Sequence, residues 1–288
     1  MRESFSGPLA SIIVIFITVV WTIPTVGLFI TSLRPATDVD TSGWWTVFFH
    51  PSQAHFTLSN YSEVMFSSAG AGTSGGLAPY FINSFAISIP ATLIPLAIAS
   101  MAAYALAWLN FRGATALFFA VFALQVVPLQ MALIPLLKIY SSSGLAGTFA
   151  PVWISHVMFS LPLAIFLLHN FMSQLPRELM EAAQVDGANH FTTFRRIVLP
   201  LSVPAIASFA IFQFLWVWND LLVALTFAGG TPEVAPITAR LSQLGGSLGS
   251  RLNLLTAGAF IAIVVPLIVF FSLQRYFVRG LLAGSVKG

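Results

Sequence analysis

The residues that could carry out chemistry in this chain are few. It has 288 residues, five histidines, nine acidic residues and no cysteine, which excludes disulfides, thiol nucleophiles and cysteine-ligated metals. His156 and His169 lie about 20 Å apart if one helix holds both, at 1.5 Å per residue. No histidine has a carboxylate neighbour at the spacing of a zinc site, and no Walker-type glycine loop occurs. The sequence therefore predicts no catalytic residue, no metal site and no cofactor bound by this chain.

Asp220 is nevertheless a candidate functional residue, because it is the only acidic residue within an apolar stretch. It directly follows Asn219. A carboxylate at membrane depth is costly and marks a functional candidate. Asn219 and Asp220 could bond the polar groups of a solute that crosses the membrane, and Trp216 or Trp218 could stack on a ring of that solute. Alternatively, Asp220 lies near a helix end, where it is hydrated or bonds freed backbone groups. We favour a structural or gating use of Asp220 over direct contact with the solute.

The elements that must position these residues are membrane helices. Hydrophobic residues make up 57% of the chain and charged residues only 7%, whereas a soluble domain carries about 25% charged residues. A bilayer is crossed by about 20 mostly apolar residues. The sequence therefore predicts an all-α, polytopic protein with one transmembrane domain over residues 1–288. Its six transmembrane helices are expected at about 8–33, 79–108, 115–138, 151–172, 203–227 and 253–276.

The positive charges orient these spans, and prolines interrupt them. With both termini inside, inner segments carry eight Lys and Arg residues and outer segments carry four, which favours an N-in/C-in arrangement. The net charge is only +3 and no basic run occurs, so nucleic acid is not an expected partner. Prolines free helix carbonyls, which at membrane depth need neighbouring helices or a water-filled cavity. Eight lie within or beside spans and favour a moving, cavity-forming bundle: Pro24, Pro90, Pro95, Pro128, Pro135, Pro162, Pro204 and Pro266.

The loop between the fourth and fifth spans, residues 173–202, reads as a docking segment. Helix formers over 177–185, the turn signal at Asp186-Gly187 and a capping residue at Asn189 predict two short amphipathic helices. Acidic groups on the polar face disfavour contact with anionic lipid, so we favour a protein partner over an interfacial helix. Ala182 and Ala183 would let the partner surface approach closely, and Glu181 and Asp186 would pair with its arginines. Phe191 and Phe194 would anchor the element to the bundle or fill a pocket.

This loop resembles the EAA motif of permease subunits in binding-protein-dependent ABC importers. The match comprises Glu181-Ala182-Ala183, then Gly187 after three residues, then Ile197-Val198-Leu199-Pro200 after nine more. The stretch 216–220 and the tail 274–288 are similar to carbohydrate permeases of the maltose type. Segments 42–45 and 56–61 look more particularly like α-glucoside permeases.

The resemblance implies a function and a set of partners. The chain would pair with a second permease, two ATPase subunits that use ATP and Mg, and an extracytoplasmic sugar-binding protein, in a bacterial or archaeal cytoplasmic membrane. An ion-coupled secondary transporter and a permease for a non-sugar solute are the alternatives. The residues expected to couple to the ATPase are Glu181, Ala182, Ala183, Asp186, Gly187, Phe191 and Pro200.

Two outer loops, 34–78 and 228–252, complete the prediction. The first is large enough for a small helical cap, with Trp44 and Trp45 at the membrane interface. The second is Gly/Ser-rich and, at 22 residues over 229–250, long for a plain connector. By resemblance to the maltose-type family it reaches the binding protein, with Glu233, Arg240 and Gln243 as candidate contacts.

Overall fold

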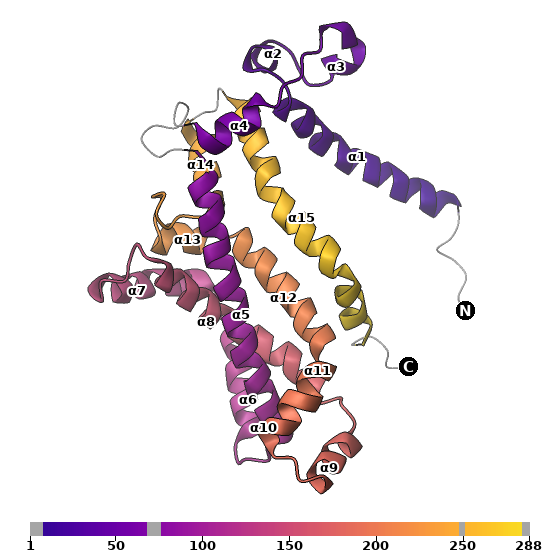
Figure 1. Ribbon diagram of the computed structural model, residues 1–288, viewed down its shortest axis with the longest axis vertical. Helices are drawn as coiled ribbons and strands as arrows, with labels where there is room; N and C mark the ends of the chain where they lie inside the picture. Colours follow the sequence, from indigo (N-terminus) through magenta and orange to yellow (C-terminus); the bar gives the residue numbers. More distant parts are fainter. Residues whose placement is uncertain (1–7, 68–75, 248–250, 284–288) are drawn as a thin grey trace. The chain divides into compact units, whose positions relative to one another are not determined.

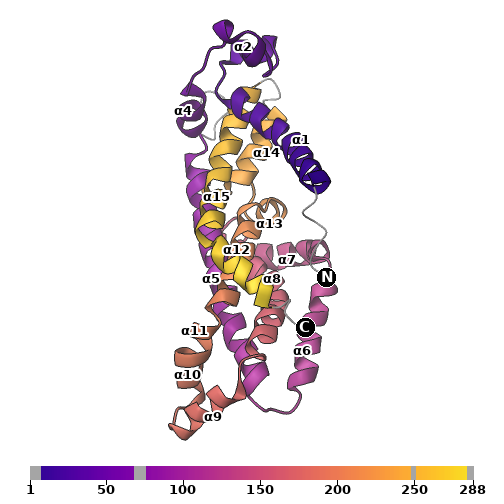
Figure 2. The same cartoon turned by 90° about the vertical axis from the view of Figure 1, so that its right-hand side faces the viewer.

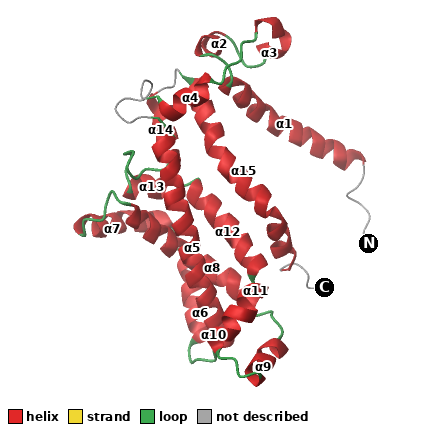
Figure 3. Cartoon of the chain, viewed as in Figure 1, coloured by secondary structure: helices red, strands yellow, loops and turns green. Residues whose placement is uncertain are grey.

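The computed structural model describes residues 8–67, 76–247 and 251–283, and the regular structure in these ranges is helical (Figures 1 and 3). The all-α prediction is confirmed for these residues. Contacts divide the chain into two compact units, residues 1–78 with 240–264 and residues 79–239 with 265–288. Arg2 and Lys287, two of the eight inner charges, lie outside the described residues, as does most of the Gly/Ser-rich stretch 67–76.

Within the described residues, four helices are long and apolar enough to cross a membrane unbroken, and two bent pairs bring the possible number of spans to six. The four long helices are α1 (Pro8–Ser32), α5 (Ala78–Trp108), α8 (Phe149–Met172) and α15 (Leu252–Ala283). The first bent pair joins α6 (Ala114–Ala123) and η3 (Leu124–Val126) to α7 (Leu129–Ser142) at 93°. The second joins α10 (His190–Thr193), η4 (Phe194–Val198) and α11 (Leu199–Leu201) to α12 (Val203–Trp218) at 71°.

The sharp bend in the expected third span has a local cause at Pro128. The residue before a proline is pushed out of the helical region, and Val127 is extended, with φ −73° and ψ 119°. Pro128 itself has ψ 125° and starts the next helix. Residues 115–138 therefore do not form the single straight helix that their apolar composition suggested.

The expected fifth span, residues 203–227, is also interrupted. Helix α12 ends at Trp218, and a separate short helix, α13 (Leu222–Phe227), begins after Asn219, Asp220 and Leu221. The break contains Asn219 and Asp220, two adjacent polar residues. The chain therefore leaves helical geometry at the point where side chains can satisfy the freed backbone groups.

The loop expected at 228–252 is partly helical, because α14 (Ile237–Ser247) occupies its middle. Pro236 precedes this helix, and proline suits a helix start. Residues 248–250 lie outside the described part of the chain.

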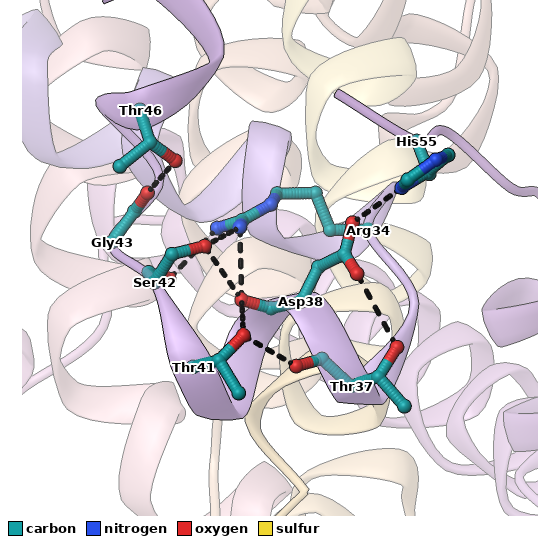
Figure 4. A network of polar contacts seen from close by, with 8 residues as sticks. All are labelled: Arg34, Thr37, Asp38, Thr41, Ser42, Gly43, Thr46 and His55. Atoms are coloured by element: carbon teal, nitrogen blue, oxygen red, sulfur yellow. Dashed lines mark hydrogen bonds and ion pairs between the residues drawn. The ribbon is translucent and has the colours of Figure 1, made fainter. Parts of the chain in front are cut away.

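The first unit carries a small folded cap on the segment after α1. It contains α2 (Ala36–Thr41), α3 (Thr46–Phe49), η1 (Pro51–Gln53) and α4 (Ser59–Phe66). Arg34 is only 3% exposed, and its guanidinium donates to the backbone oxygens of Asp38 and Ser42 and to the Ser42 hydroxyl (Figure 4). Since a cation near a helix C-terminus satisfies its last carbonyls, Arg34 closes α2 in place of a glycine cap.

The second unit is organised around α5, α8 and α12. Small residues of α5 pack with α8 and α12 in one apolar cluster that includes Ala99, Ala103, Ala164, Leu168 and Phe209. The segment between α8 and α12 carries α9 (Arg177–Val185), which lies at one end of this unit in both views (Figures 1 and 2). The three helices thus support a short helix that projects from the bundle.

Candidate functional site

The projecting helix α9 has one face on the bundle and one face open. Met180 and Ala183 are 7% and 5% exposed and belong to the bundle side, whereas Glu181, Ala182 and Val185 are exposed, Val185 to 88%. We expected both alanines to face a partner. Only Ala182 is exposed, because Ala183 is covered by the chain's own packing.

Gly187 ends α9 in a left-handed conformation, with φ +75°. The Gly187 N–H donates to the Gln184 oxygen at 3.0 Å, and the Ala188 N–H donates to the Ala183 oxygen at 2.9 Å. These two bonds form a Schellman motif, in which glycine is favoured because it has no Cβ. The local sequence therefore fixes both the length of α9 and the direction of the chain that follows.

The part of the segment that follows α9 contacts the end of α5. The Tyr104 hydroxyl lies 3.1 Å from His190 Nδ1, and the Tyr104 ring packs on Phe194 with centroids 5.2 Å apart. Residues Phe194–Val198 form a π-helical turn, a distortion that often marks functional sites. Phe191 is 68% exposed and Pro200 is exposed as well. A cavity of about 230 Å³ lies behind α9, lined by Tyr104, Trp108, Met180, Gln184, Ala188, Asn189, His190 and Thr193.

Asp220 bonds the backbone at the break between α12 and α13. Its carboxylate accepts from the Val223 N–H at 3.3 Å and from the Ala224 N–H at 2.9 Å, two amides of the first turn of α13. Its backbone oxygen accepts from the Thr238 hydroxyl at 2.6 Å. Asp220 is therefore tied to the protein at both its side chain and its main chain.

His156 of α8 is a neighbour of Asp220 that the sequence analysis did not link to it. The His156 Nε2 atom lies 3.5 Å from Asp220 Oδ2, and the His156 side chain is fully buried. Neither ring nitrogen makes a hydrogen bond within the described residues. The imidazole also meets the edge of Trp216, with centroids 5.6 Å apart. The only signal in the sequence was that both polar residues fall in apolar stretches, and spacing alone does not pair residues so far apart.

The tryptophans and Asn219 differ in their surroundings. Trp218 is 1% exposed and packs against Phe81, Phe85 and Phe214, so its ring faces are covered, contrary to the expected access to a sugar. Trp216 is half-buried and helps to line a cavity of about 430 Å³ at the bend between η3 and α7. Asn219 is exposed, and its amide donates to the Leu215 oxygen at 2.7 Å.

The candidate contacts of the second outer loop differ in their exposure to solvent. Glu233 is exposed, and a hydrogen bond with the Thr231 side chain holds the pKa of its carboxyl below its usual value. Arg240, by contrast, is 3% exposed and donates to Gln243 Oε1 at 3.1 Å within α14. An open, flexible loop was expected here, but helix formation turns Arg240 into the interior.

Comparison with known proteins identifies the family. Residues 96–282 match the model of the binding-protein-dependent transport system inner membrane component. The chain belongs to this family. Membership favours the ABC-importer permease over the ion-coupled alternative, and it confirms the resemblance to permease subunits of binding-protein-dependent importers.

The relatives and the solved structures agree with this assignment. The chain is 57% identical over 277 residues to the osmoprotective compounds uptake permease protein GgtD of Synechocystis sp., which covers 96% of this chain and 91% of the relative. It is also 57% identical over 238 residues to the alpha-glucoside transport system permease protein AglG of Rhizobium meliloti, covering 81% and 61%. A crystal structure of a bacterial ABC transporter that imports alginate shares the fold, with a TM-score of 0.72 at 19% identity, covering 96% of this chain and 100% of that one. The chain is thus a multi-pass permease subunit of an ABC importer, and ATP hydrolysis belongs to separate subunits.

Proposed function

We propose that this chain is a sugar-importing permease that couples substrate passage to a separate ATPase through α9. The observation that carries the proposal is the geometry of the segment 173–202: an acidic helix with Glu181 and Ala182 on its open face, ended at Gly187, in a chain of this family. The six spans run N-in/C-in in a bacterial or archaeal cytoplasmic membrane. In this arrangement α9 is on the inner side, where the ATPase is.

Coupling follows from rigid-body transfer of motion. Two ATPase subunits, loaded with ATP and Mg, close on each other and shift α9, which moves α8 and α12 with it. Glu181 faces basic groups of the ATPase and Ala182 allows close approach. Val185 and Phe191 contribute apolar contact, because side chains exposed to 88% and 68% outside the spans otherwise face water.

The substrate proposal rests on the relatives. One relative at 57% identity is named for α-glucosides and the other for osmoprotective compounds, so we propose an α-glucoside or a related hydroxyl-rich solute. A second permease completes the path, and an extracytoplasmic binding protein delivers the substrate. Glu233 is exposed and is the candidate contact to that protein.

A charge reversal on α9 tests the coupling proposal. Glu181→Lys is expected to abolish uptake of a labelled α-glucoside and the stimulation of ATP hydrolysis by substrate and binding protein. Glu178→Lys is the matched control, since Glu178 is also exposed on α9 but lies one turn earlier and outside the EAA motif. Membrane insertion of both variants is measured by epitope-tagged yield. Normal coupled uptake by the Glu181→Lys variant would contradict the proposal.

The substrate class is tested by the same ATPase stimulation in the complete complex. Stimulation by α-glucosides supports the sugar proposal. Stimulation by a solute without a sugar ring, and not by α-glucosides, would contradict the sugar proposal. The chain would then be assigned to the class of GgtD, the relative named for osmoprotective compounds.

A further inference from the structure

Helix α5 contains two prolines whose effects on the backbone can be followed atom by atom. Pro90 and Pro95 lie inside the helix. A proline has no N–H, so the carbonyl four residues earlier loses its helical donor. The two carbonyls freed in this way are those of Ala86 and Ala91. Leaving either one buried without a donor would destabilise the fold.

Both freed carbonyls receive a side-chain donor from another helix. Trp153 Nε1 of α8 donates to the Ala86 oxygen at 2.9 Å, and Gln213 Nε2 of α12 donates to the Ala91 oxygen at 3.1 Å. The two acceptors are five residues apart, about 7.5 Å along the helix axis. Each proline of α5 is thus matched by one donor on one neighbouring helix.

The Gln213 bond lies in a buried polar neighbourhood that is only partly satisfied. Gln213 and Ala91 are both 0% exposed. Three polar atoms around this bond have no hydrogen-bond partner among the residues that the structure describes: Gln213 Oε1, Ser88 Oγ and Thr92 Oγ1. Ser88 and Thr92 lie within one turn of Ala91 on α5. A side-chain donor with unused partners nearby can change its acceptor when helices shift, whereas a helical N–H cannot.

The two donor helices are also the two that flank the coupling segment. Helix α8 ends at Met172 and α12 begins at Val203, and α9 lies on the chain between them. A displacement of α9 is therefore passed along the chain to α8 and α12, in addition to the direct contact that the segment makes with Tyr104 of α5. The hydrogen bonds from Trp153 and Gln213 to α5 then determine whether α5 moves together with α8 and α12.

We propose that Trp153 and Gln213 are positioning residues of the transport cycle, which hold α5 to α8 and α12 through the proline-freed carbonyls of Ala86 and Ala91 and release it when the coupling segment moves. The inference rests on the proposed function, because it assumes that α9 is driven by an ATPase. It adds that the prolines of α5 exist to give these two carbonyls to mobile donors. The pair sets how tightly ATP hydrolysis is tied to substrate passage.

The test for Gln213 separates a mobile contact from a merely structural one. Gln213→Leu removes the donor, and Pro95→Ala supplies a permanent donor to the Ala91 oxygen within α5. In the complete complex in proteoliposomes, Gln213→Leu is expected to lower substrate transported per ATP hydrolysed about tenfold, the effect of losing one buried hydrogen bond in one state. It is also expected to lower the thermal stability of the complex. The double variant with Pro95→Ala regains the stability but stays uncoupled.

The controls combine a donor variant with the proline variant that restores the other carbonyl's donor. Pro90→Ala restores a donor to the wrong carbonyl, so it is expected to leave the stability loss of Gln213→Leu uncorrected. Trp153→Phe keeps the ring stacked on Phe149 and loses only the N–H. Trp153→Phe and its double variant with Pro90→Ala are a second, independent test. The single variant is expected to lose stability and coupling, and the double variant is expected to regain the stability but not the coupling.

The outcomes distinguish this inference from the proposed function. Wild-type transport per ATP in the Gln213→Leu variant, or in its double variant with Pro95→Ala, would overturn the inference and leave a structural hydrogen bond. Absence of any substrate-stimulated ATP hydrolysis in the wild-type complex would instead overturn the proposed function. If the Gln213→Leu variant fails to assemble, transport per ATP is measured in its double variant with Pro95→Ala. The Ala91 carbonyl of that double variant has a donor, so the complex is expected to assemble.

Discussion

At the scale of single residues, Asp220 shows how a carboxylate is kept in a membrane protein. Its side chain accepts two backbone N–H groups of α13 and lies 3.5 Å from a buried histidine. A carboxylate with such partners avoids much of the cost of leaving water. Bonds of this kind do not exclude a role in the translocation path, which stays a prediction together with the roles of Asn219 and Trp216.

Substitutions of Asp220 separate its backbone contacts from its charge. Asp220→Ala removes the acceptor of the α13 amides and is expected to destabilise the protein by about 1 kcal/mol, as loss of a helix-capping side chain does. Asp220→Asn keeps one acceptor oxygen and should retain most of that stability. Thermal unfolding in detergent is the measurement. Equal melting temperatures for the two variants would show that the amide bonds contribute little.

Residue burial was the part of the site that the sequence could not reveal. Trp218, Arg240 and Ala183 are each buried, and Trp218 packs on Phe81 and Phe85, which are distant in the sequence. Their residue types are equally compatible with a surface, so composition and spacing do not distinguish the two. The contact between His156 and Asp220 was hidden for the same reason.

At the scale of elements, Gly187 determines where α9 stops. Its φ of +75° costs other L-residues about 1–2 kcal/mol. A Cβ at this position meets no atom within 4 Å, so backbone strain is the only effect of Gly187→Ala. Gly144 offers a matched control: its φ is +70°, a Cβ there also meets nothing, and it lies between α7 and α8, outside the coupling segment.

The comparison of the two alanine variants is therefore informative. Both are expected to lose up to about 1–2 kcal/mol of stability through backbone strain, but only Gly187→Ala should lower substrate transported per ATP hydrolysed, because relief of that strain redirects α9. Proteoliposome uptake and phosphate release are measured side by side. A similar loss of coupling in the Gly144→Ala variant would mean that general destabilisation, and not the direction of α9, is responsible.

Helix positions were largely accessible from the sequence, whereas helix breaks were not. Apolar stretches gave the positions of α1, α5 and α8 closely, and the turn at Asp186-Gly187 gave the end of α9. The bend at Pro128 was missed, since a proline inside an apolar stretch is also compatible with a kinked but continuous helix, as in α5. In α5 the freed carbonyls receive side-chain donors from α8 and α12, and such donors are a tertiary property. The break after Trp218 contains no proline, and composition does not mark it.

At the scale of the whole molecule, the chain is one component of a larger machine. It has the helices of a permease, four unbroken and two bent pairs that allow six spans, and it belongs to a family defined by dependence on a binding protein. Many apolar side chains of α1 are exposed, as expected where lipid or a second permease covers them. Other subunits therefore supply the energy for transport and the remainder of the translocation path.

The purified chain, reconstituted alone into vesicles, is therefore expected to move no labelled α-glucoside, with or without ATP inside. Addition of the second permease, the ATPase subunits loaded with ATP and Mg, and the binding protein should restore uptake, and omission of any one of them should abolish it. The physical reason is that α9 does no work on α8 and α12 without an ATPase to move it. A vesicle that contains only this chain yet accumulates sugar would show that the path and its driving force both reside in a single polypeptide, and the coupling role of α9 would have to be abandoned.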